Sequence, residues 1–172
     1  VGAVWYPDQL GEGDSPLDAL VREWRSLGIP TAIPRVGESA RLGDVSISLL
    51  GPLRHYASPN DESIVVLVEA TSGSLLMSGD IETFAQADLG PIRADVLKVP
   101  HQGAATSDLG WLAASAPSIA VISVGPNTYG HPSPDVVSAL EQAGARVLRT
   151  DRDGTITLRF DAFAPIDLPS AP

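Results

Sequence analysis

The sequence predicts a layered α/β protein built around a mixed β-sheet. Segments with strand-like patterns follow one another directly in the first part of the chain, whereas strands and helices alternate from Asp80 onward. Consecutive strands joined by tight turns are typical of antiparallel pairing, and strand–helix alternation is typical of parallel pairing. The 172 residues, of which 44% are hydrophobic and 19% charged, suffice for one globular domain.

The first part of the chain predicts one helix and three strands. Ser15 and Pro16 form a helix-start signal, apolar residues then recur at helical spacing, and Gly28 ends a helix over 16–27. Alternating or apolar runs predict strands over 45–49, 64–68 and 75–77. A hairpin-like turn at 72–74 joins the last two strands, so these strands are expected to be antiparallel neighbours.

The second part predicts βα units and a final hairpin. Predicted helices over 82–87, 108–116 and 134–143 alternate with predicted strands over 95–99, 119–124 and 146–150. A last strand is predicted over 155–160, and Asp151 and Asp153 before it suit a tight turn better than a calcium-binding loop. The domain is expected to cover 1–161, followed by a tail over 162–172 that is rich in Pro and Ala.

The composition limits the chemistry that this chain can perform. It contains no cysteine, which excludes a disulfide partner and thiolate ligands, so a metal site would have to use His, Asp or water. The formal charge of −10 opposes tight binding to nucleic acid unless bound cations help, although acidity of this kind also keeps a protein dispersed. No uncharged apolar run approaches the roughly 18–20 residues of a membrane helix, so the chain itself is expected to be soluble. The chain begins without Met and directly in an apolar stretch, so we expect it to be part of a longer protein.

Three residues that can bind metals or transfer protons follow the ends of three successive predicted strands. They are Asp80, His101 and His131. Because neighbouring parallel strands bring their carboxyl ends to one edge of a sheet, these three side chains are expected to lie close together. A structural role remains open for each, since an Asp can cap a helix or form a turn and a His can hydrogen-bond within a loop. His55 is expected to be a loop or surface residue.

Five segments in this order resemble the C-terminal part of the metallo-β-lactamase-like domain of ComEC-type competence proteins. They are residues 60–66, 75–82 with Ser-Gly-Asp-Ile-Glu, 94–106 with Ala-Asp-Val-Leu-Lys-Val, 120–132 with Tyr-Gly-His-Pro, and 147–156. The resemblance implies the second half of an αββα sandwich, with a mixed sheet, a divalent metal centre of Zn or Mn, and hydrolysis of phosphodiesters. It also implies DNA as the substrate, the membrane channel portion of the parent protein as a partner, and a location on the extracytoplasmic side of the membrane.

The resemblance also assigns roles to individual residues. Asp80 and His101 correspond to metal ligands. His131, as a ligand or a substrate contact, and Asn127 correspond to the catalytic motif. Possible substrate contacts are Gln102, Thr106, Ser107 and Tyr129.

The sequence departs from the family pattern in two respects. The HxDxDH-type signature that supplies several metal ligands is absent from this sequence, and Gln102 stands where the family commonly has His. Our first hypothesis is therefore a metal-dependent phosphodiesterase or nuclease domain of a DNA-uptake protein whose metal site is incomplete in this chain. The alternatives are an inactive scaffold domain of a membrane DNA-uptake assembly, or a related phosphoesterase with another substrate.

Overall fold

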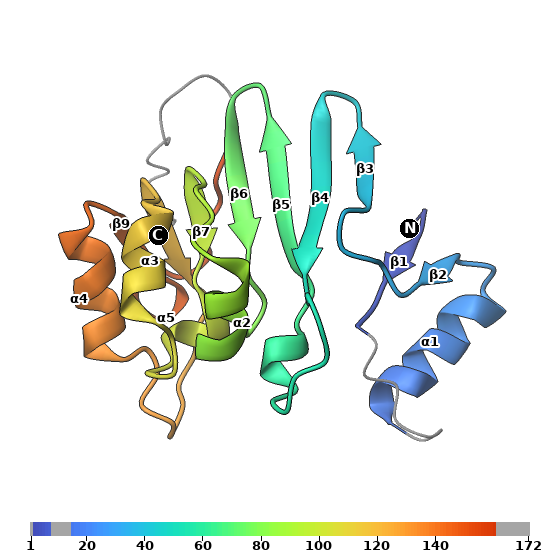
Figure 1. Ribbon diagram of the computed structural model, residues 1–172, viewed down its shortest axis with the longest axis horizontal. Coiled ribbons are helices and arrows are strands. Elements are labelled where there is room, and N and C mark those ends of the chain that lie inside the picture. Colours follow the sequence, from blue (N-terminus) through green and yellow to red (C-terminus); the bar gives the residue numbers. More distant parts are fainter. Residues whose placement is uncertain (1, 8–14, 161–172) are drawn as a thin grey trace.

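A seven-stranded mixed sheet forms the centre of the protein (Figure 1). The computed structural model describes residues 2–7 and 15–160. In spatial order the strands are β3 (Ser39–Leu42), β4 (Val45–Gly51), β5 (Val65–Ala70), β6 (Gly73–Met77), β7 (Val96–Lys98), β8 (Ile119–Ile122) and β9 (Arg146–Arg149). Each strand pairs with its neighbour in sequence, so the sheet grows from one edge to the other along the chain.

The direction of pairing changes at β6. Strands β3 to β6 are antiparallel, whereas β6 to β9 are parallel, with Leu75 opposite Val96 and Val96 opposite Ile119. The predicted change from antiparallel hairpins to parallel βα units is therefore confirmed. The short strand β3 was not predicted from the sequence.

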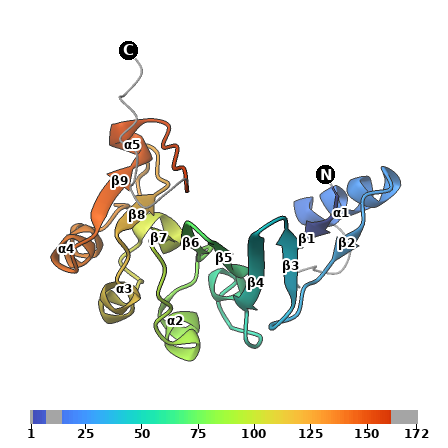
Figure 2. The ribbon, with the colours of Figure 1, turned by 90° about the horizontal axis from the view of Figure 1, so that it is seen from above.

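Helices α2 (Thr83–Leu89), α3 (Leu109–Ser115) and α4 (Pro134–Gln142) cover one face of the sheet (Figure 2). The core between them and the sheet includes Leu76, Leu97, Leu112, Ala120 and Leu140, all completely or almost completely buried. This packing holds the parallel strands and their connecting loops in fixed positions.

The other face of the same strands is apolar as well. Since side chains alternate along a strand, the residues next to core residues such as Val65, Leu76 and Ala120 point to this face. They include Val66, Met77 and Val121, which lie in one row with Lys98. The side of the sheet opposite α2, α3 and α4 thus carries apolar side chains, of which Met77 is 47% exposed.

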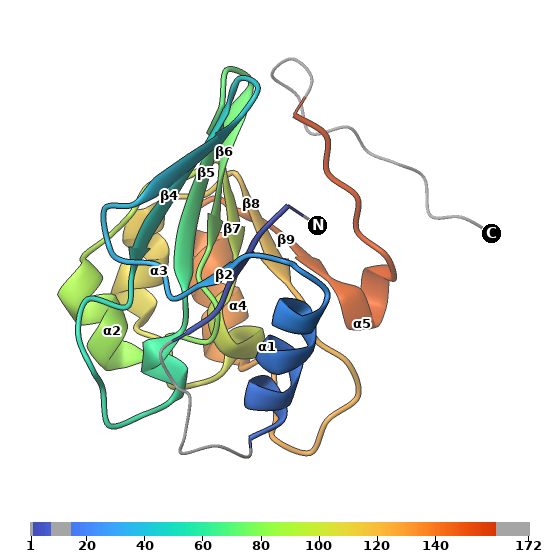
Figure 3. The ribbon, with the colours of Figure 1, turned by 90° about the vertical axis from the view of Figure 1, so that its right-hand side faces the viewer.

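A small unit lies beyond the β3 edge of the sheet (Figure 2), and it lies in front of the sheet in Figure 3. It contains α1 (Pro16–Ser26) and a separate parallel pair, β1 (Val4–Trp5) with β2 (Thr31–Ala32). Helix α1 begins with a capping box, in which the Ser15 hydroxyl accepts from the Asp18 amide and the Asp18 carboxylate accepts from the Ser15 amide. Arg25 near the end of the helix donates to the Tyr6 hydroxyl at 3.0 Å, which ties α1 to the strand pair.

The predicted hairpin after β9 is wrong. A short helix, α5 (Thr150–Asp153), follows β9, and 155–160 forms no strand. Arg149 binds the Asp151 carboxylate through two nitrogens, and the Arg149 amide donates to Asp153 at 2.7 Å. These local bonds close a helical turn where the sequence suggested a hairpin corner. The predicted tail over 162–172 lies outside the described residues.

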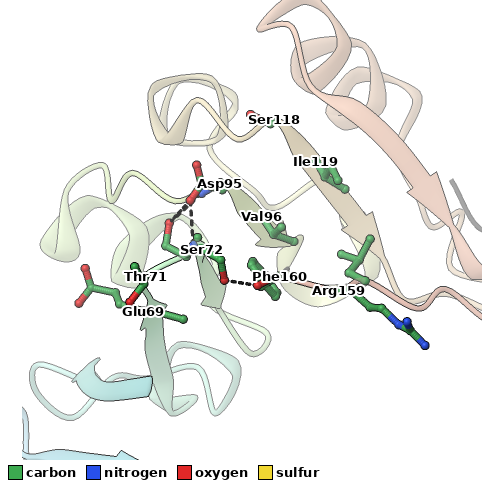
Figure 4. A pocket seen from close by; sticks show the side chains of 13 residues that line it. Glu69, Thr71, Ser72, Asp95, Val96, Ser118, Ile119, Arg159 and Phe160 are labelled. Atoms are coloured by element: carbon green, nitrogen blue, oxygen red, sulfur yellow. Dashed lines mark hydrogen bonds between the residues drawn. The ribbon is translucent and has the colours of Figure 1, made fainter. Parts of the chain in front are cut away.

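Residues 158–160 instead line a pocket of about 520 Å³ near the start of β6 (Figure 4). The Ser72 hydroxyl donates to the Phe160 carbonyl there, and Asp95 accepts from the amide and the hydroxyl of Ser74 at 2.8 and 2.7 Å. The pocket lies by the first residues of β6, β7 and β8, at the edge of the sheet opposite the candidate site described next.

Candidate active site at the carboxyl edge of the sheet

The loops after β6, β7 and β8 meet at one edge of the sheet, as the parallel pairing requires. The ring centroids of His101 and His131 are 5.4 Å apart, and the rings are inclined by 66°. The amide of His101 donates to the carbonyl of Gly79, directly before Asp80, at 3.3 Å. The structure therefore brings together the three loops that carry Asp80, His101 and His131.

Asp80 is held at the end of β6 by its own backbone and by a lysine from β7. Its amide donates to the Ser63 hydroxyl at 3.0 Å. Lys98 donates from Nζ to the Gly79 carbonyl at 2.8 Å, and the same nitrogen lies 3.5 Å from Asp80 Oδ1. Gly79 has a φ of 58°, and a Cβ there would lie 2.5 Å from the Ser63 Cβ, so only glycine fits before this carboxylate. The Asp80 side chain remains 47% exposed.

His101 and Gln102 lie in a tight turn with left-handed backbone, at φ values of 45° and 55°. This conformation is unfavourable for residues with a Cβ and persists only where the surroundings impose it. The carbonyl of Gly103 accepts from the Ser133 amide at 2.8 Å, and a Cβ on Gly103 would lie 2.7 Å from the Pro132 Cβ. The turn is thus fixed against the loop that carries His131.

Glu82 is a site residue that the sequence analysis did not identify. Its Oε1 lies 3.2 Å from His101 Nδ1 and accepts from the Thr106 hydroxyl at 2.8 Å, and its Oε2 accepts from the Ser58 hydroxyl at 3.1 Å. Burial raises the pKa of the Glu82 carboxyl, but these hydroxyl donors and the nearby His101 outweigh it, so the pKa lies below its usual value. The only signal for Glu82 in the sequence is its place two residues after Asp80.

Asn127 organises the loop between β8 and α4. Its amide nitrogen donates to the carbonyls of Gly125 and His131 at 3.0 and 2.8 Å. Its oxygen accepts from the amides of Tyr129 and His131 at 3.1 and 3.0 Å. Tyr129 is 80% exposed and stacks on the His131 ring with the centroids 5.9 Å apart. Asn127 therefore positions a His–Tyr pair at the surface of the loop.

The remaining predicted contacts differ in their accessibility. Thr106 is exposed, but its hydroxyl is bound to Glu82. Ser107 is buried, and within the described part of the chain its hydroxyl has no hydrogen-bond partner. Gln102 is half-buried beside His101. His55 is an exposed loop residue, as expected, and its Nδ1 lies 3.2 Å from Glu62.

The donors at this edge do not complete a metal site by themselves. Among residues 2–7 and 15–160, no group of three or more His, Asp and Glu side chains is arranged to hold a metal ion. Asp80 and His101 are suitable donors, but a stable site for Zn or Mn takes three or four protein ligands. Lys98 also places a positive charge next to Asp80. The donors in the described part of the chain thus do not fit a metal centre by themselves.

Comparison with solved structures defines the class of the fold. A crystal structure described as a metal-dependent hydrolase from Parabacteroides distasonis superposes with a TM-score of 0.51, at 14% identity, over 86% of this chain and 75% of that one. At this identity the likeness concerns the fold alone. The α/β arrangement, with its mixed sheet and one helical layer, agrees with the metallo-β-lactamase-like fold that the resemblance implied.

Comparison with curated proteins defines the particular relatives. ComE operon protein 3 of Bacillus subtilis is 32% identical over 150 residues, which are 83% of this chain and 19% of that protein. Competence protein ComA of Neisseria gonorrhoeae is 36% identical over 110 residues, which are 60% of this chain and 16% of that protein. No family model matches the chain. The chain is thus related to one segment of the ComEC-type competence proteins, and it spans less than a fifth of the length of these relatives. No helix in the described ranges is long and apolar enough to cross a membrane.

Proposed function

We propose that this chain forms one side of the active site of a metal-dependent phosphodiesterase or nuclease domain in a DNA-uptake protein. The observation that carries the proposal is the convergence of the loops bearing Asp80, His101 and His131 at the carboxyl edge of β6, β7 and β8. Hydrolases of the α/β type gather their reactive groups at this edge. The relation to competence proteins supports single-stranded DNA as the substrate.

Each residue has a separate task in this proposal. Asp80 and His101 are two ligands of a divalent cation, Zn or Mn, whose other ligands come from a part of the protein outside this sequence. His131 is either a contact of the scissile phosphate or a further metal ligand, and Asn127 holds the loop that carries it through hydrogen bonds to the His131 backbone. Tyr129 offers an exposed aromatic face on which a base can stack. Gln102 and Thr106 border the same edge as neutral polar contacts, and Ser107 lies buried next to Thr106.

The net charge agrees with a cation-dependent site. At −10 the chain repels a polyanion, so bound cations would have to offset that repulsion where the phosphate lies. The relation to membrane competence proteins further supports a parent protein whose channel portion passes the DNA, with this domain on the extracytoplasmic side.

A scaffold without activity is the second candidate. Three observations favour it: no complete donor set lies in the described residues, Lys98 is paired with Asp80, and Gln102 replaces a potential ligand or proton carrier. In this case the domain contributes only contacts to the uptake assembly.

The test uses a longer protein that includes the segment preceding this sequence. Its metal content is measured by mass spectrometry, and cleavage of single-stranded DNA is followed with Mn or Zn. Asp80→Ala is expected to abolish cleavage and reduce bound metal, whereas Asp135→Ala, at an exposed Asp on α4, is expected to change neither. If the protein binds metal but cleaves only a phosphoester other than DNA, it would be a related phosphoesterase. A folded protein with neither metal nor cleavage would support the scaffold.

A further inference from the structure

Glu82 lies at the centre of a polar cluster whose members are distant in sequence. Its partners are Ser58 from the loop before η1 (Asn60–Glu62), His101 from the turn after β7, and Thr106 from the loop before α3. Asn60 of η1 borders the cluster beside His101. The Glu82 side chain is 19% exposed and that of His101 is 24% exposed. The cluster is thus largely shielded from water, where hydrogen bonds to an ionised group are stronger than at the surface.

The partners of Glu82 fix where hydrogen atoms lie in this cluster. An ionised carboxylate only accepts hydrogen bonds, at about four lone-pair positions. The hydroxyls of Ser58 and Thr106 donate to it at 3.1 and 2.8 Å. His101 Nδ1, at 3.2 Å from Oε1, can make a favourable contact with this carboxylate only if it carries a hydrogen.

The amide nitrogen of Asn60 competes with Glu82 for the same ring atom. It lies 3.5 Å from His101 Nδ1, at the limit of hydrogen-bond distance, and could bind only an Nδ1 that carries a lone pair. The ionised Glu82 carboxylate lies closer, at 3.2 Å, and this shorter, charge-assisted contact favours a hydrogen on Nδ1. A neutral imidazole carries one hydrogen, so a hydrogen on Nδ1 leaves Nε2 with the lone pair. The carboxylate is itself anchored, because the Glu82 amide donates to the buried Asp61 at 2.7 Å.

We propose that Glu82 is a positioning residue that holds His101 in the tautomer with hydrogen on Nδ1, so that Nε2 is the electron-pair donor of the ring. This arrangement is the one in which a carboxylate orients a metal-binding or proton-accepting histidine. The tautomer follows from the cluster alone. Its use in catalysis rests on the function proposed above.

The tautomer is measured by nitrogen-15 NMR of the histidine rings in this chain at about pH 9, where ordinary imidazoles with a pKa of about 6.5 are neutral. Only three histidines are present, and signals are assigned with His55→Gln, His101→Gln and His131→Gln. The unaltered chain is expected to show His101 with hydrogen on Nδ1. A His101 ring with hydrogen on Nε2 would overturn the proposal without any variant of Glu82.

Glu82→Leu removes the acceptor and is expected to shift His101 to the Nε2–H form, which predominates in free histidine. Glu82→Gln keeps an oxygen that can accept from Nδ1 and is expected to retain the original tautomer. The matched control is Glu62→Leu, because Glu62 lies at the same 3.2 Å distance from Nδ1 of the exposed His55. It should change the His55 signals only. An unchanged His101 tautomer in a folded Glu82→Leu chain counts against the proposal.

The functional consequence is tested separately in the longer protein. Loss of a carboxylate that orients a ligand typically weakens metal binding by about 10- to 100-fold, and Glu82→Leu is expected to do so while Glu82→Gln largely restores binding. If the unaltered longer protein binds no metal but the tautomer depends on Glu82, the positioning role holds and the proposed nuclease function fails. If the longer protein binds metal but the tautomer of His101 does not depend on Glu82, the positioning role fails and the proposed nuclease function is still supported.

Discussion

At the scale of single residues, the buried Asp61 connects the segment that carries Glu82 to the loop before β5. Its Oδ1 accepts from the amides of Glu82 and Ala85 at 2.7 and 3.3 Å, which caps the start of α2. Asp61→Ala would leave these donors without their acceptor, so we expect it to lower the free energy of unfolding by about 1–3 kcal/mol in urea titrations. Asp61→Asn retains an acceptor oxygen and should cost less. Equal stability of all three proteins would show that the cap contributes nothing.

The Tyr56 phenol gives a prediction for alkaline pH. Burial, followed by the hydrogen bond to Asp88, raises the pKa of Tyr56 to about 12. Since the unfolded pKa is about 10, Tyr56 adds stability that is complete below pH 10 and is lost as the pH rises toward 12. The free energy of unfolding should fall in this window, and less steeply in Tyr56→Phe. Asp88→Asn should shift the phenolate absorbance transition to lower pH, and an unshifted transition would contradict this assignment.

The sequence correctly placed three candidate residues that follow strand ends close to one another. Asp80, His101 and His131 could be placed together because parallel pairing fixes where strand ends lie. Glu82 was missed because its role depends on partners far away in the sequence, from Ser58 to Thr106. No local pattern encodes such a cluster.

At the scale of elements, Gly103 controls how two site loops fit together. Both Gly103 and Gly144 have positive φ, at 77° and 90°, but only Gly103 is crowded, by Pro132. Gly144→Ala should therefore lose only the backbone preference, about 1 kcal/mol, whereas Gly103→Ala should lose about 2 kcal/mol or more and separate the loops. Thermal unfolding measures both variants. If both variants lose a similar amount of stability, Pro132 can move aside at no energetic cost, and the prediction is wrong.

The errors of the sequence analysis concern short elements. A strand was predicted at 155–160 after a hairpin turn, but the bonds of Arg149 to Asp151 and Asp153 form the short helix α5 at the position of that turn, and 155–160 does not pair with β9. The strands β2 and β3 were missed because two to four residues carry too little periodicity. The longer strands and helices agree with the prediction to within a few residues.

At the scale of the whole molecule, the apolar face opposite the helices predicts self-association. Met77 lies on this face, between Val66 and Lys98, and is 47% exposed. Apolar sheet surface of this kind is covered in stable proteins. We expect the isolated chain to associate in sedimentation experiments, and Met77→Lys to shift it toward the monomer. Leu27→Lys, at an exposed Leu after α1, should have little effect. A monomer that unfolds sharply and reversibly would contradict the prediction.

The architecture as a whole could be predicted from the sequence because its signals are long and regular. Hairpins up to β6 and βα units after it define a mixed sheet with few alternative topologies. The two-stranded unit around α1 could not be predicted, because β1 and β2 each contribute two residues and pair across the whole helix.

The change of direction at β6 also orders the folding of the chain. Tight turns join β3 to β4 and β5 to β6, and residues 52–64 connect β4 to β5, so these contacts are more local in sequence than those of the later strands and can form early. Strands β7, β8 and β9 each require a helical crossover of tens of residues before they can dock. The strands that pair early thus provide an edge on which β7, β8 and β9 can pair. We expect the carboxyl edge with His101 and His131 to form in the slowest phase of folding. Amide hydrogen exchange should accordingly protect β4 and β5 before β8 during refolding.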